Sequence, residues 1–303
     1  MSDDIAFTGE RFIPGAQGPI WIEHWHRYHF AAPLAQGKRV LDIACGEGYG
    51  TALLARSAAH VTGVDVAAAA VRHAQRTYAD IANARFVEGA CTAIPLADAS
   101  IDLAVSFETI EHITGQQGFI DELARVLAPG GVLLLSSPDK AEYSDKRGYA
   151  NEFHVRELYR DELAVLLQSR FPHLAWFGQR PTFYSVIAPE APAERGVLVE
   201  VGEEDPSRGG HALPAPLYHL VAASRDAAAL QNVPATLHVL ADRADWVWRD
   251  YEKVMKWMEA ATKDNDRLRA ELAARDAATS SNPASARRTG FAGLLARLFG
   301  GVR

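Results

Sequence analysis

Residues 40–50 read VLDIACGEGYG, an apolar run that ends at Asp42 and passes into a glycine-rich turn. The segment after Gly50 has the pattern of a helix. A glycine-rich turn between a strand and a helix lets a ligand approach bare backbone and the N-terminus of the helix. The stretch therefore predicts a ligand site where the first strand of an α/β sheet ends.

Short apolar runs alternate with helical patterns along much of the chain. Seven of these runs are predicted as strands: residues 39–44, 60–66, 84–89, 101–107, 131–137, 173–179 and 216–224. Continuous apolar strands that alternate with helices are typical of a parallel sheet covered by helices on both faces. The sequence therefore predicts an α/β fold.

The composition is that of an acidic globular chain of 303 residues, 48% of them hydrophobic. Its 38 acidic and 31 basic residues give a net charge of -7, which argues against general nucleic-acid binding because phosphates need clustered cations. The two cysteines, Cys45 and Cys91, do not suggest a disulfide framework. Because there is neither a signal-peptide pattern nor an apolar run of the ~18 residues that span a membrane, we expect a cytoplasmic protein.

The character of the chain changes after about residue 232. Apolar or small residues then recur at alternating spacings of four and three, at Val233, Leu237, Leu240, Ala244, Val247, Tyr251, Val254, Met258, Ala261, Leu268 and Leu272. Only Asn265 interrupts this series. The pattern predicts a heptad helix over residues 231–278, either a coiled coil that makes a homo-oligomer or a single amphipathic helix packed on its own domain.

Residues 279–303 form a linker followed by a basic amphipathic segment. The end of the chain, FAGLLARLFGGVR, carries apolar residues on one helical face and has arginines around it. Such a segment can dock on a membrane surface, here the inner face of the membrane, or on a partner protein. The alternative is a short helix folded back on its own domain.

The turn after Asp42 does not suit a dinucleotide. Gly46 and Gly48 are followed by Thr51 where a G-x-G-x-x-G fingerprint needs its third glycine, and the charge of Asp42 would repel a pyrophosphate. A cationic ligand such as S-adenosylmethionine fits better, because it carries a sulfonium and an ammonium group. Asp65 ends the next strand, at the separation where a carboxylate accepts hydrogen bonds from ribose hydroxyls. On its own, Asp65 could equally cap a helix.

Four segments in order resemble the motifs of class I S-adenosylmethionine-dependent methyltransferases: VLDIACGEGYG, VTGVDV, FVEGACTAIPLADASIDLAVSFETIEHI and ELARVLAPGGVLLLSSPDK. The resemblance covers about residues 38–140. It implies a Rossmann-like fold with a seven-stranded, mostly parallel sheet and helices on both faces, followed here by a long C-terminal helix. It also implies S-adenosyl-L-methionine as the cofactor. Residues 1–230 would then be the methyltransferase domain, with residues 1–37 as an N-terminal lid and 38–140 as the cofactor-binding core.

The resemblance assigns cofactor contacts residue by residue. The implied set is Asp42, Ala44, Gly46 and Gly48 in the first motif, Asp65 and Val66 at the ribose, Ala90 and Cys91 at the adenine, and Phe107 beneath the cofactor. Arg27, ahead of the first strand, is a further candidate for the methionine carboxylate, because arginine binds carboxylates through both oxygens. Two positions depart from the family pattern. Ala44 replaces a glycine, which we expect to be harmless because alanine is small, and Ala90 replaces an acid that often receives the adenine amino group.

The flanking segments FTGERFIPG, IEHWHRYHFA and SSPDKAEYSDKRGYANEFHVREL are similar to methyltransferase modules of bacterial O-antigen and polysaccharide assembly, of the chain-terminating type. This similarity implies O-methylation of a sugar, a glycan end or a sugar phosphate in surface polysaccharide biosynthesis. One alternative is a small-molecule O-methyltransferase of the quinone or natural-product type, for which the charged lid segments are a poor match. Another is an assembly protein that holds the cofactor and works through its coiled coil.

Candidate catalytic residues follow the fourth strand. Glu108, Glu111 and His112 lie in the segment ETIEH, and His154 could approach from a later loop. In one hypothesis His112 is a general base oriented by a glutamate. In a second, the four residues bind a divalent metal, because their spacing resembles metal-dependent small-RNA 2′-O-methyltransferases and ubiquinone-pathway O-methyltransferases. In the third, Glu108 and Glu111 cap a helix or pair locally and His112 packs in the core.

Overall fold

The computed structural model describes residues 19–181, 198–200, 208–210, 213, 215–240 and 246–280. The chain divides into two compact units, Met1–Asp242 and Arg243–Arg303. Two expectations fall largely outside the described residues: the first half of the N-terminal lid and the basic C-terminal segment.

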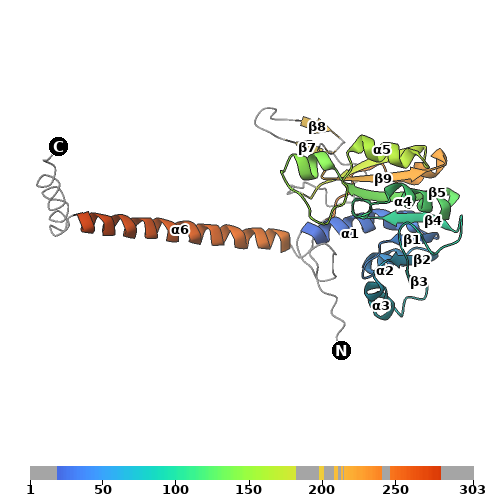
Figure 1. The fold of residues 1–303 in the computed structure, drawn as a ribbon, viewed down its shortest axis with the longest axis horizontal. Coiled ribbons are helices and arrows are strands. Elements are labelled where there is room, and N and C mark those ends of the chain that lie inside the picture. The colour runs from blue at the N-terminus through green and yellow to red at the C-terminus, as the bar shows by residue number, and fades with distance from the viewer. Residues whose placement is uncertain are drawn as a thin grey trace, which may run out of the picture. The chain divides into compact units, whose positions relative to one another are not determined.

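The first unit is built on a seven-stranded sheet in the order β3-β2-β1-β4-β5-β9-β6 (Figure 1). The strands are β1 (Arg39–Ile43), β2 (His60–Asp65), β3 (Ala84–Glu88), β4 (Ile101–Ser106), β5 (Leu127–Pro138), β6 (His173–Gln179) and β9 (Tyr218–Ser224). Strands β1 to β5 pair in parallel, whereas β9 runs antiparallel to both β5 and β6. The predicted seven-stranded, mostly parallel sheet is confirmed. A separate two-stranded sheet joins β7 (Leu198–Glu200) and β8 (Arg208–Gly210).

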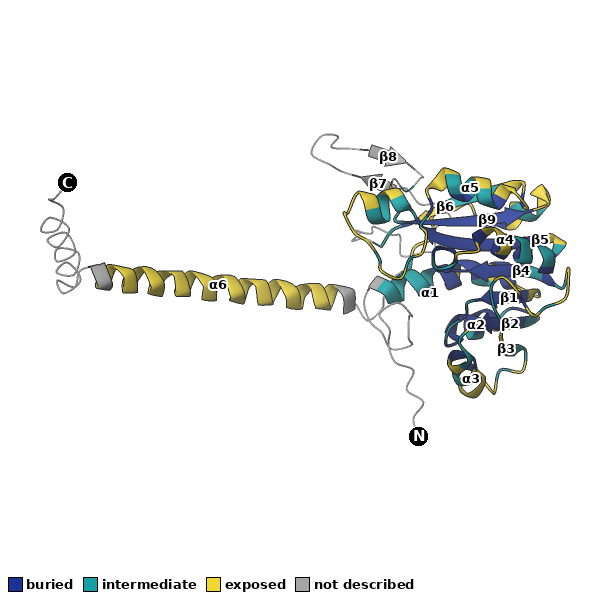
Figure 2. Ribbon diagram, in the orientation of Figure 1, coloured by how far each residue is buried: buried dark blue, intermediate teal, exposed yellow. Residues whose placement is uncertain are grey.

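Helices cover both faces of the sheet, as predicted. They are α1 (Pro19–Ala31), α2 (Tyr49–Leu54), α3 (Ala68–Thr77), α4 (Gln116–Val126) and α5 (Arg160–Gln168), with short turns η1 (Ala32–Ala35), η2 (Ile110–His112), η3 (Ala141–Asp145) and η4 (Ala227–Asn232). Adjacent residues of a strand point to opposite faces. Val40 and Leu103 therefore pack in the core beneath α1 and α2, while Leu41 and Ala104 pack in the core beneath α4 and α5. The inner strands of the sheet are accordingly buried, whereas the edge strands β3 and β6 are only partly buried (Figure 2).

The C-terminal helix begins later than the heptad pattern predicts. It is α6 (Trp246–Ser280), and residues 233–240 are not helical. Val233 instead lies buried in the core of the first unit, with an extended backbone. Two physical effects explain the difference. The core of the first unit buries the Val233 side chain, which fixes the backbone there in an extended conformation. Pro234 also disfavours a helical conformation of Val233, the residue before it. The predicted start of the heptad helix at residue 231 was therefore wrong.

Helix α6 contains 35 residues, which corresponds to about 52 Å of helix. Within the second unit its described side chains are exposed, including Val254, Met258, Leu268 and Leu272 of the heptad pattern (Figure 2). None of the helices in the described ranges is both long and apolar enough to cross a bilayer.

Candidate active site

The glycine-rich turn joins β1 to α2 and depends on left-handed backbone. Gly46 and Gly48 have φ angles of 54° and 86°, a region that favours glycine. A Cβ at Gly48 would also lie 2.6 Å from the ring of Phe86, so no side chain fits there. Ala44 is left-handed too, with φ of 61°. The expectation that Ala44 is harmless was therefore incomplete, because the missing glycine costs backbone strain as well as volume.

Asp42 lies in β1, just before this turn, and links the strand to the helices on either side of it in the sequence. Its carboxylate accepts hydrogen bonds from the Tyr28 hydroxyl of α1 at 3.0 Å and from the Thr51 hydroxyl of α2 at 2.6 Å. Burial raises the pKa of Asp42 to about 7. Thr51, the residue that replaces the third fingerprint glycine, is thus the link between Asp42 and α2. Attraction of Asp42 for a cationic ligand stays a prediction.

Asp65 ties the turn to the end of β2. One carboxylate oxygen accepts a hydrogen bond from the Gly46 amide at 2.8 Å, and the other accepts one from the Ala67 amide at 2.8 Å. Asp65 does not cap α3, whose N-cap is Ala67 and has no side-chain cap hydrogen bond. Because a carboxylate has about four acceptor positions, the two amides leave lone pairs for the predicted ribose contact. Val66, the next residue, is 71% exposed although it is apolar, which fits contact with a flat ring such as adenine.

The other predicted cofactor contacts follow β3 and β4. Ala90 forms a bridge with Ala93, and Cys91 next to it is partly buried, which raises the pKa of its thiol to about 11. Phe107 is buried after β4 and packs edge-on against Tyr28, with ring centroids 5.1 Å apart. Because β3, β2, β1 and β4 are neighbours in the sheet, the turns after these parallel strands lie along one edge.

Arg27 reaches the same region from α1 and is 1% exposed. Its Nε donates to Gln179 Oε1 at 2.7 Å, and its guanidinium lies 4.5 Å from the ring centroid of Tyr218. Nη2 lies 3.4 Å from Glu108 Oε1 in an ion pair. Neither Nη1 nor Nη2 has a hydrogen-bond partner among the described residues. Two unpartnered, buried donors on one guanidinium suit a carboxylate, which arginine binds through both oxygens.

Three residues around Arg27 were not predicted from the sequence. They are Glu23 on α1, Gln179 at the end of β6 and Tyr218 at the start of β9. Gln179 also donates to the Glu23 carbonyl at 3.0 Å, and burial raises the pKa of Glu23 to about 7 despite the positive charge of Arg27. Glu23 lies one helical turn before Arg27 on α1, whereas no motif joins Gln179 and Tyr218 to Arg27, because the antiparallel strands β6 and β9 bring them there.

Glu108 is separated from the other catalytic candidates. Its backbone has a φ of 49°, and its amide donates to Ser136 Oγ at 3.0 Å. The Ser136 hydroxyl in turn donates to Glu108 Oε1 at 2.6 Å, the same oxygen that faces Arg27. Glu108 therefore belongs with Arg27 rather than with a four-residue metal set.

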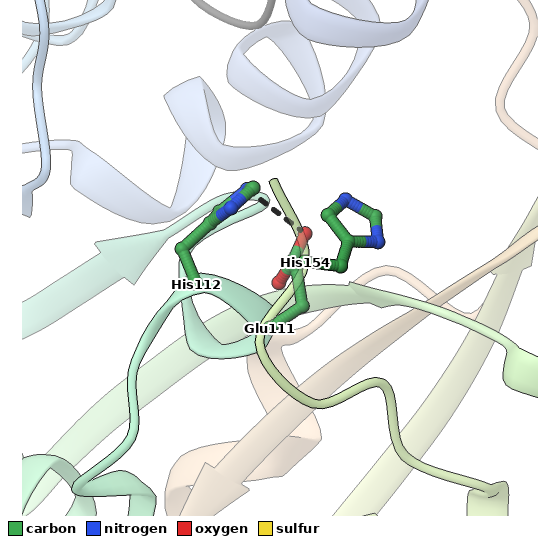
Figure 3. A group of neighbouring side chains, drawn as sticks. All are labelled: Glu111, His112 and His154. Carbon is green, nitrogen blue, oxygen red and sulfur yellow. Dashed lines mark ion pairs between the residues drawn. The ribbon is translucent and has the colours of Figure 1, made fainter. Parts of the chain in front are cut away.

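Glu111, His112 and His154 form a cluster after β4 (Figure 3). One ligand atom from each lies within 4.8 Å of the others, and the two imidazole rings flank the carboxylate. Glu111 is 1% exposed, and neither carboxylate oxygen has a hydrogen-bond partner among the described residues. Burial, reinforced by the negative charge of Glu108, raises the pKa of Glu111 well above its usual range.

The donor set of this cluster fits a divalent cation. His112 Nδ1 lies 3.1 Å from the Phe153 carbonyl, which can only accept, so Nδ1 carries the hydrogen. His112 Nε2 lies 3.9 Å from Glu111 Oε1. An imidazole that donates through one nitrogen and offers the other is typical of metal ligands. A cation would ligate the Glu111 oxygens, which have no hydrogen-bond partner among the described residues, whereas a proton would remove the charge but leave a buried O–H without an acceptor there.

Residues 41–135 match the family model described as a methyltransferase domain. The chain is 41% identical over 170 residues to a probable S-adenosylmethionine-dependent methyltransferase of Mycolicibacterium smegmatis, a match that covers 54% of this chain and 64% of the relative. It is 34% identical over 123 residues to the ubiquinone biosynthesis O-methyltransferase of Idiomarina loihiensis, covering 39% of this chain and 50% of that protein. The chain thus spans less than two thirds of either relative.

The fold is similar to the methyltransferase solved with a methyltransferase activator from Haloferax volcanii. The match has a TM-score of 0.52 and 19% identity, and it covers 68% of this chain and 91% of that chain. Residues 41–135 thus match a methyltransferase domain, and the Mycolicibacterium smegmatis relative is named as a probable member of the S-adenosylmethionine-dependent class. S-Adenosylmethionine is the cofactor of that class, as the sequence predicted.

Proposed function

We propose that the protein is an O-methyltransferase that uses S-adenosylmethionine and accepts its substrate beside Glu111, His112 and His154. One observation carries the proposal. A buried carboxylate without hydrogen-bond partners among the described residues lies between two imidazoles, after the strand that neighbours the glycine-rich turn. A methyl donor and an oxygen nucleophile must meet at such an edge for in-line transfer.

The bound cofactor supplies an electrophilic methyl group on a sulfonium. Arg27 would bind the methionine carboxylate through Nη1 and Nη2, neither of which has a hydrogen-bond partner among the described residues. Asp65 would accept hydrogen bonds from the ribose hydroxyls with the lone pairs that the Gly46 and Ala67 amides leave unused. Val66, Ala90 and Cys91 would contact the adenine, and Phe107 would exclude water from beneath the methyl group.

An acceptor hydroxyl must lose its proton during transfer. Glu111, His112 and His154 would hold a divalent cation, which lowers the pKa of a bound hydroxyl. The alternative is that His112 accepts the proton directly. The cation is favoured by Glu111: its buried oxygens lack partners among the described residues, and a simple base would not need a second histidine and a buried carboxylate beside it.

We propose a sugar hydroxyl, a glycan end or a sugar phosphate as the acceptor, in surface polysaccharide biosynthesis. Vicinal sugar oxygens suit a cation site, and Arg147 lies over two tyrosine rings, 5.6 Å from the centroid of Tyr143 and 5.7 Å from that of Tyr149. Arginine and aromatic rings together bind sugars and phosphates. The proposal of a sugar or sugar-phosphate acceptor rests on the similarity of the flanking segments and on these contacts of Arg147.

A quinone-type small molecule is the second candidate. The lid is less uniformly charged than the sequence suggested, because Tyr149 is 46% and Phe153 40% exposed on the segment that carries His154. One relative is named as a ubiquinone biosynthesis O-methyltransferase. A catechol-like acceptor would also offer vicinal oxygens to a cation.

We further propose that α6 pairs with a second copy of the chain as a coiled coil. The residues at heptad spacing from Val254 to Leu272 are exposed and apolar, except Asn265, and a helix of 35 residues provides five heptads. A single asparagine at a core position specifies register in such assemblies. Light scattering of the whole chain and of residues 1–242 tests the idea; equal oligomeric order for both would refute it.

Calorimetric titration tests the proposed reaction. S-Adenosylmethionine is titrated first, and Mn²⁺ is then titrated into the saturated protein, with His112→Ala, His154→Ala and the exposed His173→Ala as a matched control. We expect Mn²⁺ binding in wild type and in His173→Ala and its loss in the other two variants. Transfer of labelled methyl to nucleotide sugars or to a catechol then separates the two acceptor classes. Absence of cofactor binding would overturn the enzyme proposal.

A further inference from the structure

The ring of His154 is held in a defined orientation by Glu157. His154 Nδ1 and Glu157 Oε1 are 2.6 Å apart, and the two side chains are buried together. The second oxygen of Glu157 accepts a hydrogen bond from the Ser144 hydroxyl at 2.5 Å. Tyr143 stacks on the ring, with centroids 5.7 Å apart and planes at 27°. The imidazole is therefore restrained at one edge and on one face.

Two independent contacts agree on which nitrogen carries the hydrogen. A carboxylate only accepts, so the contact with Glu157 puts a hydrogen on His154 Nδ1. On the other side, Asn151 Oδ1 accepts from the Phe153 amide at 3.1 Å, which fixes the orientation of the Asn151 side-chain amide. Its Nδ2 then donates to His154 Nε2 at 3.0 Å, so Nε2 presents a lone pair.

We propose that Glu157 is a positioning residue that keeps His154 in the Nδ1–H tautomer and so reserves Nε2 as its reactive atom. The inference deepens the proposed function and rests on it, because His154 is taken to bind a cation or accept a proton. His112 has the same arrangement with a neutral partner, the Phe153 carbonyl. A carboxylate behind an imidazole both fixes the tautomer and strengthens the opposite nitrogen as a ligand.

Asn151 contacts the nitrogen of His154 that is proposed to react. Its Nδ2 donates a hydrogen bond to the lone pair of His154 Nε2, the atom that Glu157 keeps unprotonated. Binding at Nε2 therefore has to displace the Asn151 amide, while Nδ1 keeps its bond to Glu157. When the Asn151 amide is displaced, the bond to Glu157 therefore keeps the ring from flipping and the hydrogen from moving to Nε2.

The test reads the tautomer directly, without any acceptor or activity. Long-range ¹H–¹⁵N spectra of the labelled full chain, free of metal, distinguish protonated from unprotonated ring nitrogens, and His154→Gln identifies the signals. We expect the Nδ1–H form in wild type. Glu157→Gln keeps an acceptor oxygen and should retain this form, whereas Glu157→Ala should give a mixture of tautomers. Glu152→Gln, an exposed glutamate in the same segment, is the matched control and should match wild type.

Titration of Co²⁺ alone, followed by visible absorption, gives a second readout. Loss of Glu157 should weaken Co²⁺ binding about 10- to 100-fold, as expected for the partner of a metal-binding histidine. An Nε2–H tautomer in wild type would overturn the inference even if Glu157→Ala does not fold, and so would an unchanged Nδ1–H form in Glu157→Ala. If wild type does not bind Co²⁺ but Glu157→Ala loses the tautomer, the positioning role stands and only the cation in the proposed function fails.

Discussion

Replacement of Asp65 by alanine should weaken both the fold and cofactor binding, by amounts that can be separated. The carboxylate accepts two partly buried backbone hydrogen bonds, from Gly46 and Ala67, each at 2.8 Å. An unpaired donor costs about 1–3 kcal/mol, so Asp65→Ala should lower the free energy of unfolding by about 2–6 kcal/mol. Asp65→Asn keeps one carbonyl acceptor and should lose about half as much.

The effect on S-adenosylmethionine is additional. Two ribose hydroxyls that donate to a carboxylate contribute about 1.5–3 kcal/mol each. Their loss in Asp65→Ala corresponds to about a 10²- to 10⁴-fold increase in Kd. Calorimetric titration measures the Kd, and urea unfolding followed by tryptophan fluorescence measures the stability.

Asp102→Ala is the matched control for Asp65→Ala. Asp102 also accepts a backbone hydrogen bond, from the Arg39 amide at 3.0 Å, but it lies on β4 next to the start of β1, at the opposite end of the sheet. The control should lower stability and leave the Kd unchanged. If Asp65→Ala also lost stability while it bound the cofactor within about twofold of wild type, the ribose role would be refuted and Asp65 would be purely structural.

Three further changes test the turn and the tail. Ala44→Gly should raise the calorimetric unfolding midpoint by about 1–3 °C, because it relieves left-handed strain; a lower midpoint would contradict this. With the pKa of Asp42 raised to about 7, the folded state favours the protonated acid. The stability of wild type relative to Asp42→Asn should therefore fall by about 2–4 kcal/mol as urea unfolding is repeated from pH 4 to pH 8, and a flat difference would refute the shift. Asn265→Val should stabilise the α6 assembly against heat by circular dichroism while relaxing its oligomer number in light scattering; no change in either would argue against a core position.

The sheet and the cofactor turn could be predicted because their signals are local. A glycine at φ of 86°, an aspartate at a strand end and apolar strands that alternate with helices each constrain the backbone within a few residues. Because parallel strands end at the same edge of a sheet, the turns after β1 and β2 lie together at that edge. Asp65 could be assigned for this reason before its contacts with the turn were known.

The environment of Arg27 could not be predicted in the same way. Gln179 and Tyr218 come from β6 and β9, more than 150 residues along the chain from Arg27, and they meet it only because β9 inserts antiparallel between β5 and β6. Glu108 and Glu111 are three residues apart, but the left-handed backbone at Glu108 directs it to Ser136 and Arg27, away from the histidines. Spacing alone could not separate them.

The heptad periodicity also predicted the start of the C-terminal helix wrongly, because burial of one residue in the series prevents helix there. The heptad series runs through Val233, but the core of the first unit buries that side chain, so α6 begins at Trp246. The amino-acid sequence alone thus determined the α/β class, the glycine turn and the site's position at one sheet edge, because short-range backbone preferences and strand polarity suffice for these. Tertiary packing alone determined which charged side chains meet, since desolvation, ion pairing and tautomer choice depend on neighbours such as Glu157 that packing brings to His154.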